Sequence, residues 1–245
     1  LAGTADLQTL RPLAFGKKQF AASARYEVAD IGALNKDIDD TGYRLTGFYV
    51  DQFANNTIGL AIGISTQSTP NHGERWEAWG YPEQSPGVLV IGGAKPYVES
   101  RTLERDAIVG TLEFQPTNTF STTVDAFYSK FTDDGVLRGI ELPLFWSGAQ
   151  LQPGFTVEDG LITQGQFNGV KGVVRNDFRG REAKVLSLGW NTEWQFAENY
   201  TLELDLSRSS VERNDIDIET YSGTGRGANG ATDNLAFRKA GDGGF

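Results

Sequence analysis

The residues that could do chemistry are few and scattered along this chain of 245 residues. Cysteine is absent, which excludes disulfides and thiolate metal sites, and His72 is the only histidine. His72 lies in a Pro-Asn-His-Gly stretch, where we expect a turn, and nothing nearby would complete a catalytic dyad or a metal site. We therefore expect no catalytic residue, no metal site and no cofactor.

Carboxylates are the remaining groups able to act as acids or bases. Four of them share the polar side of an alternating pattern: Asp125, Glu193, Glu203 and Asp205. Two carboxylates held at a set separation can catalyse glycoside hydrolysis, but we expect these four to pair with arginines instead. A further acidic stretch follows at Asp215, Asp217 and Glu219. Clustered oxygens of this kind could bind calcium, although a solvated strand end is the interpretation that we favour.

Three aromatic residues form the candidate ligand-binding site: Trp76, Trp79 and Tyr81. They fall in a stretch, residues 68–101, that we expect to be a long loop. Rings of this kind could stack on a sugar or on an aromatic chelator. They could also pin the loop to its surroundings, which is the interpretation that we favour.

The charge and hydropathy of the chain limit the classes of protein to which it could belong. The net charge is −10 and basic residues form no run, whereas binding a nucleic-acid backbone requires clustered Lys and Arg. We therefore expect no nucleic-acid partner. The mean hydropathy of −0.35 is typical of a soluble protein, but a membrane barrel that alternates apolar and polar residues has a similar mean.

A period of two predicts the elements that position these residues. From Leu186 to Phe196 the apolar residues occupy alternate positions, and polar or small residues lie between them. Such alternation indicates a strand with one apolar and one polar face. Similar segments cover residues 20–28, 58–65, 108–114, 120–129 and 202–207, whereas residues 43–52 alternate poorly. We count about seven strands in all.

Short and long connections alternate between these strands. Three tight turns, at residues 53–57, 114–119 and 196–201, each begin with Phe, pass through Asn and end on Thr, while residues 68–101 and 132–181 form long connections. This asymmetry is typical of outer-membrane barrels. The sequence therefore predicts an all-β fold, an antiparallel transmembrane β-barrel with long extracellular loops, in which Trp190 and Trp194 face lipid. A soluble β-sandwich is the alternative.

Five stretches carry a family resemblance: residues 73–82 (GERWEAWGYP), 93–97 (GAKPY), 125–131 (DAFYSKF), 137–143 (LRGIELP) and 219–225 (ETYSGTG). In this order they resemble TonB-dependent receptors of Gram-negative bacteria. The resemblance implies a barrel of about 22 strands, plugged by a separate N-terminal domain. Residues 1–245 would form the central part of that barrel domain, since no plug, TonB-contact segment or closing strand is recognisable. Phe245 follows a Gly-rich loop, so we do not interpret it as the end of a closing strand.

The resemblance also implies a function and a set of partners. The function would be TonB-coupled uptake of a scarce nutrient, such as an iron chelate, cobalamin or an oligosaccharide, across the outer membrane. The partners would be outer-membrane lipid and lipopolysaccharide, the remainder of the receptor, the TonB complex acting through the plug, and the solute. Two other classes remain open: a passive porin-like or structural barrel, and a secreted carbohydrate-binding β-sandwich.

Overall fold

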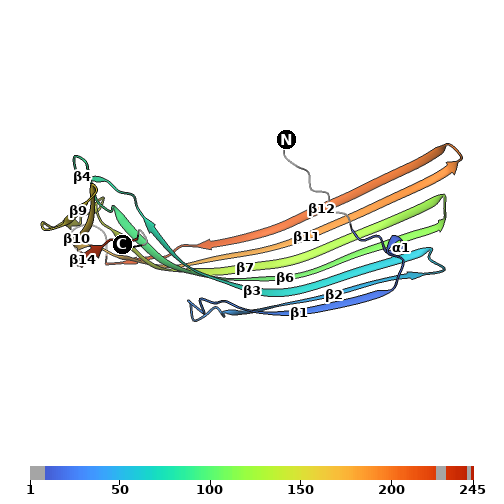
Figure 1. Cartoon of the computed structure of the whole chain (residues 1–245), viewed down its shortest axis with the longest axis horizontal. Helices are drawn as coiled ribbons and strands as arrows, with labels where there is room; N and C mark the ends of the chain where they lie inside the picture. Colours follow the sequence, from blue (N-terminus) through green and yellow to red (C-terminus); the bar gives the residue numbers. More distant parts are fainter. Residues whose placement is uncertain (1–8, 225–229, 242–243) are drawn as a thin grey trace.

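A computed structural model describes residues 9–224, 230–241 and 244–245 of the chain. Its main element is an antiparallel sheet, the long sheet, in which seven strands lie in the order β1-β2-β3-β6-β7-β11-β12 (Figure 1). The strands are β1 (Gln19–Val28), β2 (Thr41–Phe53), β3 (Ile58–Ala78), β6 (Gly93–Thr117), β7 (Phe120–Pro143), β11 (Val173–Ala197) and β12 (Tyr200–Ile218). A short strand, β13 (Tyr221–Gly223), continues alongside β11. The all-β class is confirmed.

The three predicted tight turns are confirmed and lie together at one end of the long sheet, the turn end (Figure 1). In the first turn Ala54, Asn55 and Asn56 have φ values of 51°, 55° and 64°. Asparagine tolerates this left-handed conformation better than most residues, because its short side chain can hydrogen-bond locally. The Phe residues that precede these turns therefore lie at the same end of neighbouring hairpins.

The long connections are much shorter than the sequence predicts. Strand β3 continues to Ala78, β7 continues to Pro143 and β11 begins at Val173. His72 and Trp76 are consequently strand residues, and the turn predicted at His72 is wrong. The expectation fails because these parts of the strands carry polar residues on both faces, which removes the alternation while backbone pairing continues.

The remaining connections and the segment that contains residues 233–238 fold into a second sheet, the small sheet, at the opposite end, the loop end (Figure 1). Its strands are β4 (Glu83–Ser85), β5 (Val88–Leu89), β8 (Gln150–Leu151), β9 (Thr156–Glu158), β10 (Leu161–Val170) and β14 (Asp233–Arg238). Ile91, Leu144, Ile162 and Phe167 form its buried core, and Trp76 of β3 packs against that core. The main hydrophobic core thus lies at the loop end, where the sequence predicts only loops.

One face of the long sheet carries an apolar band, and we call this face the band face. The band includes Ile62, Leu112, Tyr128, Leu188 and Leu204, all of them more than a third exposed. On β11 it extends from Leu186 to Trp194, which is about 27 Å of strand. Beyond Leu186 and Tyr128 the same face becomes charged, and on β12 the charge begins at Arg208, opposite Leu188. No helix in the described part of the chain is long and apolar enough to cross a membrane.

The opposite face, the polar face, is covered near the turn end by residues 9–16. This segment includes the short helix α1 (Pro12–Phe15), and Arg11 pairs with Asp125 at 3.3 Å. The backbone nitrogen of Leu13 donates a hydrogen bond to Glu113 at 2.7 Å. Gly59 makes the close approach possible, because a Cβ there would lie 2.9 Å from Pro12 and Leu13. The chain therefore lies on the polar face before it enters β1.

Candidate functional site

The three aromatic candidates have two different sets of neighbours. The rings of Trp76 and Tyr81 lie 6.4 and 6.2 Å from the ring of Phe245. Trp79 instead has the Lys95 ammonium 5.4 Å from its ring centroid. The expectation that all three share a loop is wrong for Trp76, which belongs to β3. Trp76 and Tyr81 therefore adjoin the same ring, whereas Trp79 contacts Lys95.

A denser group of functional side chains lies on the polar face, in the half of the long sheet nearer the loop end. Backbone pairing aligns one cross-strand row from β3 to β12: Asn71, Arg101, Gly135, Arg179 and Asp217. The next row toward the turn end is Thr69, Leu103, Asp133, Arg181 and Asp215. Side chains two residues apart on a strand share a face, so these rows place arginines and carboxylates side by side.

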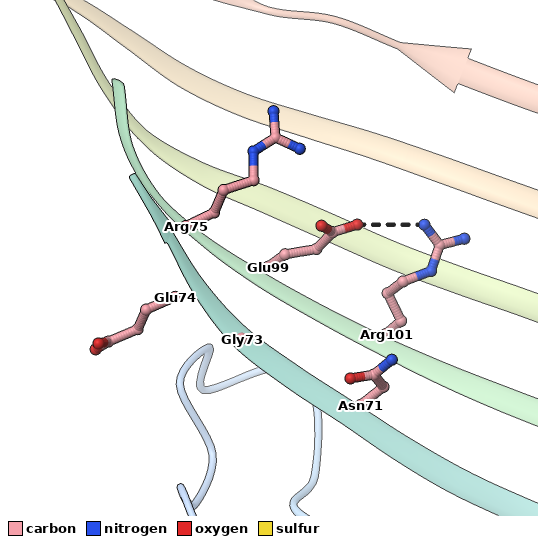
Figure 2. Close-up of a pocket in the computed structure, with 6 residues that line it drawn as sticks. All are labelled: Asn71, Gly73, Glu74, Arg75, Glu99 and Arg101. Atoms are coloured by element: carbon pink, nitrogen blue, oxygen red, sulfur yellow. Dashed lines mark hydrogen bonds and ion pairs between the residues drawn. The ribbon is translucent and has the colours of Figure 1, made fainter. Parts of the chain in front are cut away.

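Two adjoining recesses open on this part of the polar face. The first, which we call the arginine recess, has a volume of about 400 Å³. Its charged lining residues are Arg101, Arg179, Arg181, Arg213, Asp215 and Asp217. The second has about 330 Å³ and shares Arg101. Figure 2 shows that its Arg75, Glu99 and Arg101 project from one side of the sheet, whereas Glu74 points to the other side.

Arg101 connects the two recesses and is held firmly. Its Nη2 and Nε lie 2.7 and 3.1 Å from the Asp133 carboxylate, and its Nη1 lies 3.3 Å from Glu99. The hydrogen bonds to Asp133 raise the pKa of the guanidinium. Gly135 leaves room for this arrangement, because a Cβ at that position would lie 2.6 Å from Cγ of Arg101. Arg101 is thus a fixed positive charge between the recesses.

The other three arginines of the recess are more loosely engaged and about half exposed. Arg181 and Arg213 share one partner, Asp215, through contacts of 2.8 and 2.6 Å, and they lower the pKa of its carboxyl. Arg179 makes one long contact of 3.4 Å with Asp217. Guanidinium groups keep their charge at all ordinary pH values and donate several hydrogen bonds. The arrangement therefore suits binding rather than proton transfer.

A buried ionic network supports the recesses from the loop end. Arg175 contacts Glu141 at 2.5 Å and Asp177 at 2.6 Å, and its guanidinium lies 3.9 Å from the ring centroid of Tyr221. The Tyr97 hydroxyl donates to Glu141 at 2.7 Å. Burial alone would raise the pKa of Glu141, but hydrogen bonds from Tyr97 and Arg175 outweigh burial and hold that pKa below its usual range. Burial opposes the charge of Arg175, yet its hydrogen bonds to Asp177 and Glu141 raise its pKa.

Five of the seven acidic candidates from the sequence have identifiable partners, whereas Glu193 and Glu203 lie opposite each other on β11 and β12 and make no ion pair within the described residues. The predicted pairing with arginine is confirmed for Asp125, which pairs with Arg11. Asp205 accepts a hydrogen bond from Asn191 at 3.3 Å instead. In the stretch considered for calcium, each acid faces an arginine: Asp215, Asp217 and Glu219 contact Arg181, Arg179 and Arg175. In the described ranges, no group of three or more His, Asp or Glu is arranged to hold a metal.

His72 bridges two segments of the structure. Its Nδ1 lies 2.8 Å from the Ser100 hydroxyl and its Nε2 lies 3.0 Å from the Asp39 carbonyl oxygen. The ring therefore ties the β1–β2 connection to β3 and β6.

Sequence reasoning missed the arginines of the recess because it treated their segments as loops. The position of these arginines along the strand could have identified them. Arg179 and Arg181 occupy odd-numbered positions of β11, as do the polar-face residues Ser187 and Gly189. A search for relatives adds no assignment, since no family model and no curated protein matches this chain.

Proposed function

We propose that this chain forms part of the wall and of the extracellular region of a larger outer-membrane barrel. The whole barrel would be a receptor for TonB-coupled uptake of a scarce nutrient. The observation that carries the proposal is the apolar band on one face of the long sheet. Its length of about 27 Å on β11 is close to the roughly 25 Å apolar belt of such barrels. A soluble sandwich would cover a band of this kind with a second sheet. The small sheet instead packs at the loop end.

The unpaired edges of the long sheet support a larger assembly. In the described structure β1 pairs only with β2, and β12 pairs only with β11. Strand edges cannot remain open in a bilayer, because lipid offers no hydrogen bonds to their backbone groups. Further strands of the same receptor would complete both edges and close the barrel.

The segment at residues 9–16 supports a plugged interior. It lies on the polar face, where Arg11 and Leu13 engage Asp125 and Glu113. In a closed barrel the polar face would line the lumen, and the chain would then reach β1 from inside. This course fits a receptor whose preceding domain fills the lumen. The TonB complex would act through that domain.

Fractionation of native cells tests the membrane location. We expect the protein in detergent-solubilised outer membrane, with an intact mass well above the 26.7 kDa of this chain. A soluble species of 26.7 kDa would contradict the proposal. It would favour the rival class, a secreted carbohydrate-binding sandwich.

A pair of arginine substitutions tests which face meets lipid. Leu204→Arg places a charge in the apolar band and should cost about 2–4 kcal/mol of folding stability in bilayers. Ser187→Arg is the matched control, because Ser187 lies on the polar face, where its hydroxyl forms a hydrogen bond of 3.0 Å with the Ser209 hydroxyl. Unfolding titrations of the whole receptor in liposomes would measure both. Equal losses at the two positions would refute the assignment of faces.

Energy dependence separates a TonB-coupled receptor from a passive porin. Accumulation of the solute by intact cells should stop when an uncoupler collapses the proton gradient or when TonB is deleted. Uptake that persists under both conditions would favour the passive barrel instead.

A further inference from the structure

The arginine recess carries an excess of positive charge in a strongly acidic chain. Four guanidinium groups and two carboxylates line it, although the whole chain has a net charge of −10. Its acids are also shared, since Asp215 serves both Arg181 and Arg213. The local charge is therefore not a consequence of overall composition.

The arginines of the recess retain unused hydrogen-bond donors. Arg179 and Arg181 contact their carboxylates through Nε alone. Their terminal nitrogens have no hydrogen-bond partner within residues 9–224, 230–241 and 244–245. Two such forks lie two residues apart on the same face of β11, so they can approach one bound group together. Arg101, held by Asp133 and Glu99, adds a fixed charge across Gly135.

We propose that the arginine recess binds an oxyanion, a carboxylate or phosphate group, of the solute that the receptor takes up. This inference rests on the proposed function for its biological setting, and it narrows the solute to an anionic class. The guanidinium fork matches two oxygens of a carboxylate or phosphate, and charge-assisted bonds of this type are the strong ones. A neutral oligosaccharide would offer the free terminal nitrogens of Arg179 and Arg181 no charged acceptor.

The position of the recess fits capture from outside the cell. It lies beyond the apolar band toward the loop end, on the face that would line the lumen of a closed barrel. Attraction between exposed charges falls steeply beyond the Debye length, about 8 Å at physiological ionic strength. A solute anion would therefore be attracted once it had passed between the outer segments.

Binding of small anions to the purified whole receptor in detergent tests the proposal. The probes are citrate for carboxylates and inorganic pyrophosphate for phosphates, with the neutral sugar raffinose as the control, and titration calorimetry gives the affinities. We expect at least one anion to bind, raffinose not to bind, and the affinity to fall as salt is added. Citrate binding alone would identify a carboxylate solute, and pyrophosphate binding alone a phosphate. Failure of both anions to bind would overturn the inference.

Three variants locate the binding. Arg179→Gln should weaken the anion about tenfold or more, because it removes a charged donor. Asp215→Asn should strengthen it, because this change releases Arg181 and Arg213 from their shared partner. A merely structural role for these residues would not produce opposite signs. Arg208→Gln, on the band face of β12, is the matched control and should change nothing. A loss with Arg208→Gln equal to that with Arg179→Gln would refute the location.

The outcomes distinguish this inference from the proposed function. A receptor that fractionates with the outer membrane and imports solute, yet binds neither anion, would leave the function standing and refute the recess. A soluble protein that binds citrate through Arg179 would retain the anion site and refute the outer-membrane assignment.

Discussion

At the scale of single residues, the ionic network around Arg175 shows how the polar face tolerates buried charge. Arg175, Glu141 and Asp177 are each less than a tenth exposed. Isolated charges there would be costly, but each has partners within 2.6 Å. Removing one partner leaves the others buried and uncompensated. The stability of the adjoining strand ends therefore depends on every residue of the network.

The network predicts an acid-sensitive loop end. The pKa of Glu141 is lowered in the folded protein, so its stabilising contribution is complete above its unfolded pKa of about 4.3. That contribution is lost as the pH falls through the lower, folded pKa. We expect the protection of residues 137–143 and 173–177 against hydrogen exchange, corrected for the intrinsic pH dependence of exchange, to fall below about pH 4.

Glu141→Gln provides the control for this pH dependence. The substitution should cost about 3 kcal/mol at pH 7, because it leaves Arg175 with one fewer anionic partner. It should also remove most of the acid-induced change at these residues. If the variant retained the full pH response, another group would be responsible.

At the scale of elements, residues 9–16 form a separate layer on the polar face. The layer is fastened by Arg11 to Asp125, by Leu13 to Glu113 and by the Gln52 amide, which donates to the Pro12 carbonyl oxygen at 2.8 Å. It rests on Gly59, where no side chain intervenes. The docking of residues 9–16 therefore depends on Gly59 of β3 as well as on the residues of the segment itself.

Gly59→Val should detach this layer. The new Cβ would lie 2.9 Å from Pro12 and Leu13, and overpacking of this kind costs about 1–3 kcal/mol. We expect faster proteolysis within residues 9–18 of the folded protein. Gly73→Val is the matched control on the same face of the same strand, because a Cβ there meets nothing within 4 Å. Equal proteolysis of both variants would show that Gly59 does not support the segment.

The elements also show what the sequence could predict. Alternation identified the strands near the tight turns, such as residues 186–196, because there one face is apolar and the other is not. It failed beyond them, because Arg101, Asp133 and Arg181 lie on the parts of β6, β7 and β11 nearer the loop end, where both faces carry polar residues. The small sheet could not be predicted, since its strands are short and its core residue Phe167 finds partners only through tertiary packing. The arginine recess was missed because its strand segments show no alternation of apolar and polar residues.

At the scale of the whole molecule, two features point to missing neighbours. In the part of the chain that the structure describes, no layer covers the apolar band of the long sheet, and β12 is exposed along all of its residues. Exposed apolar patches of this size mark interaction surfaces in folded proteins. Open edges offer unpaired backbone groups to any available strand. In the barrel that we propose, lipid would cover the band and further strands would pair the edges.

These features predict the behaviour of the chain when it is expressed alone. In buffer without detergent, the 245-residue chain should associate through its edges and its apolar band, because water satisfies the edges but not the band. Detergent should cover the band and reduce association, while the edges still pair between copies. Light scattering coupled to size exclusion would follow both conditions. A monodisperse 26.7 kDa species in plain buffer would mean that this face does not require lipid, and the barrel proposal would then fail at its main premise.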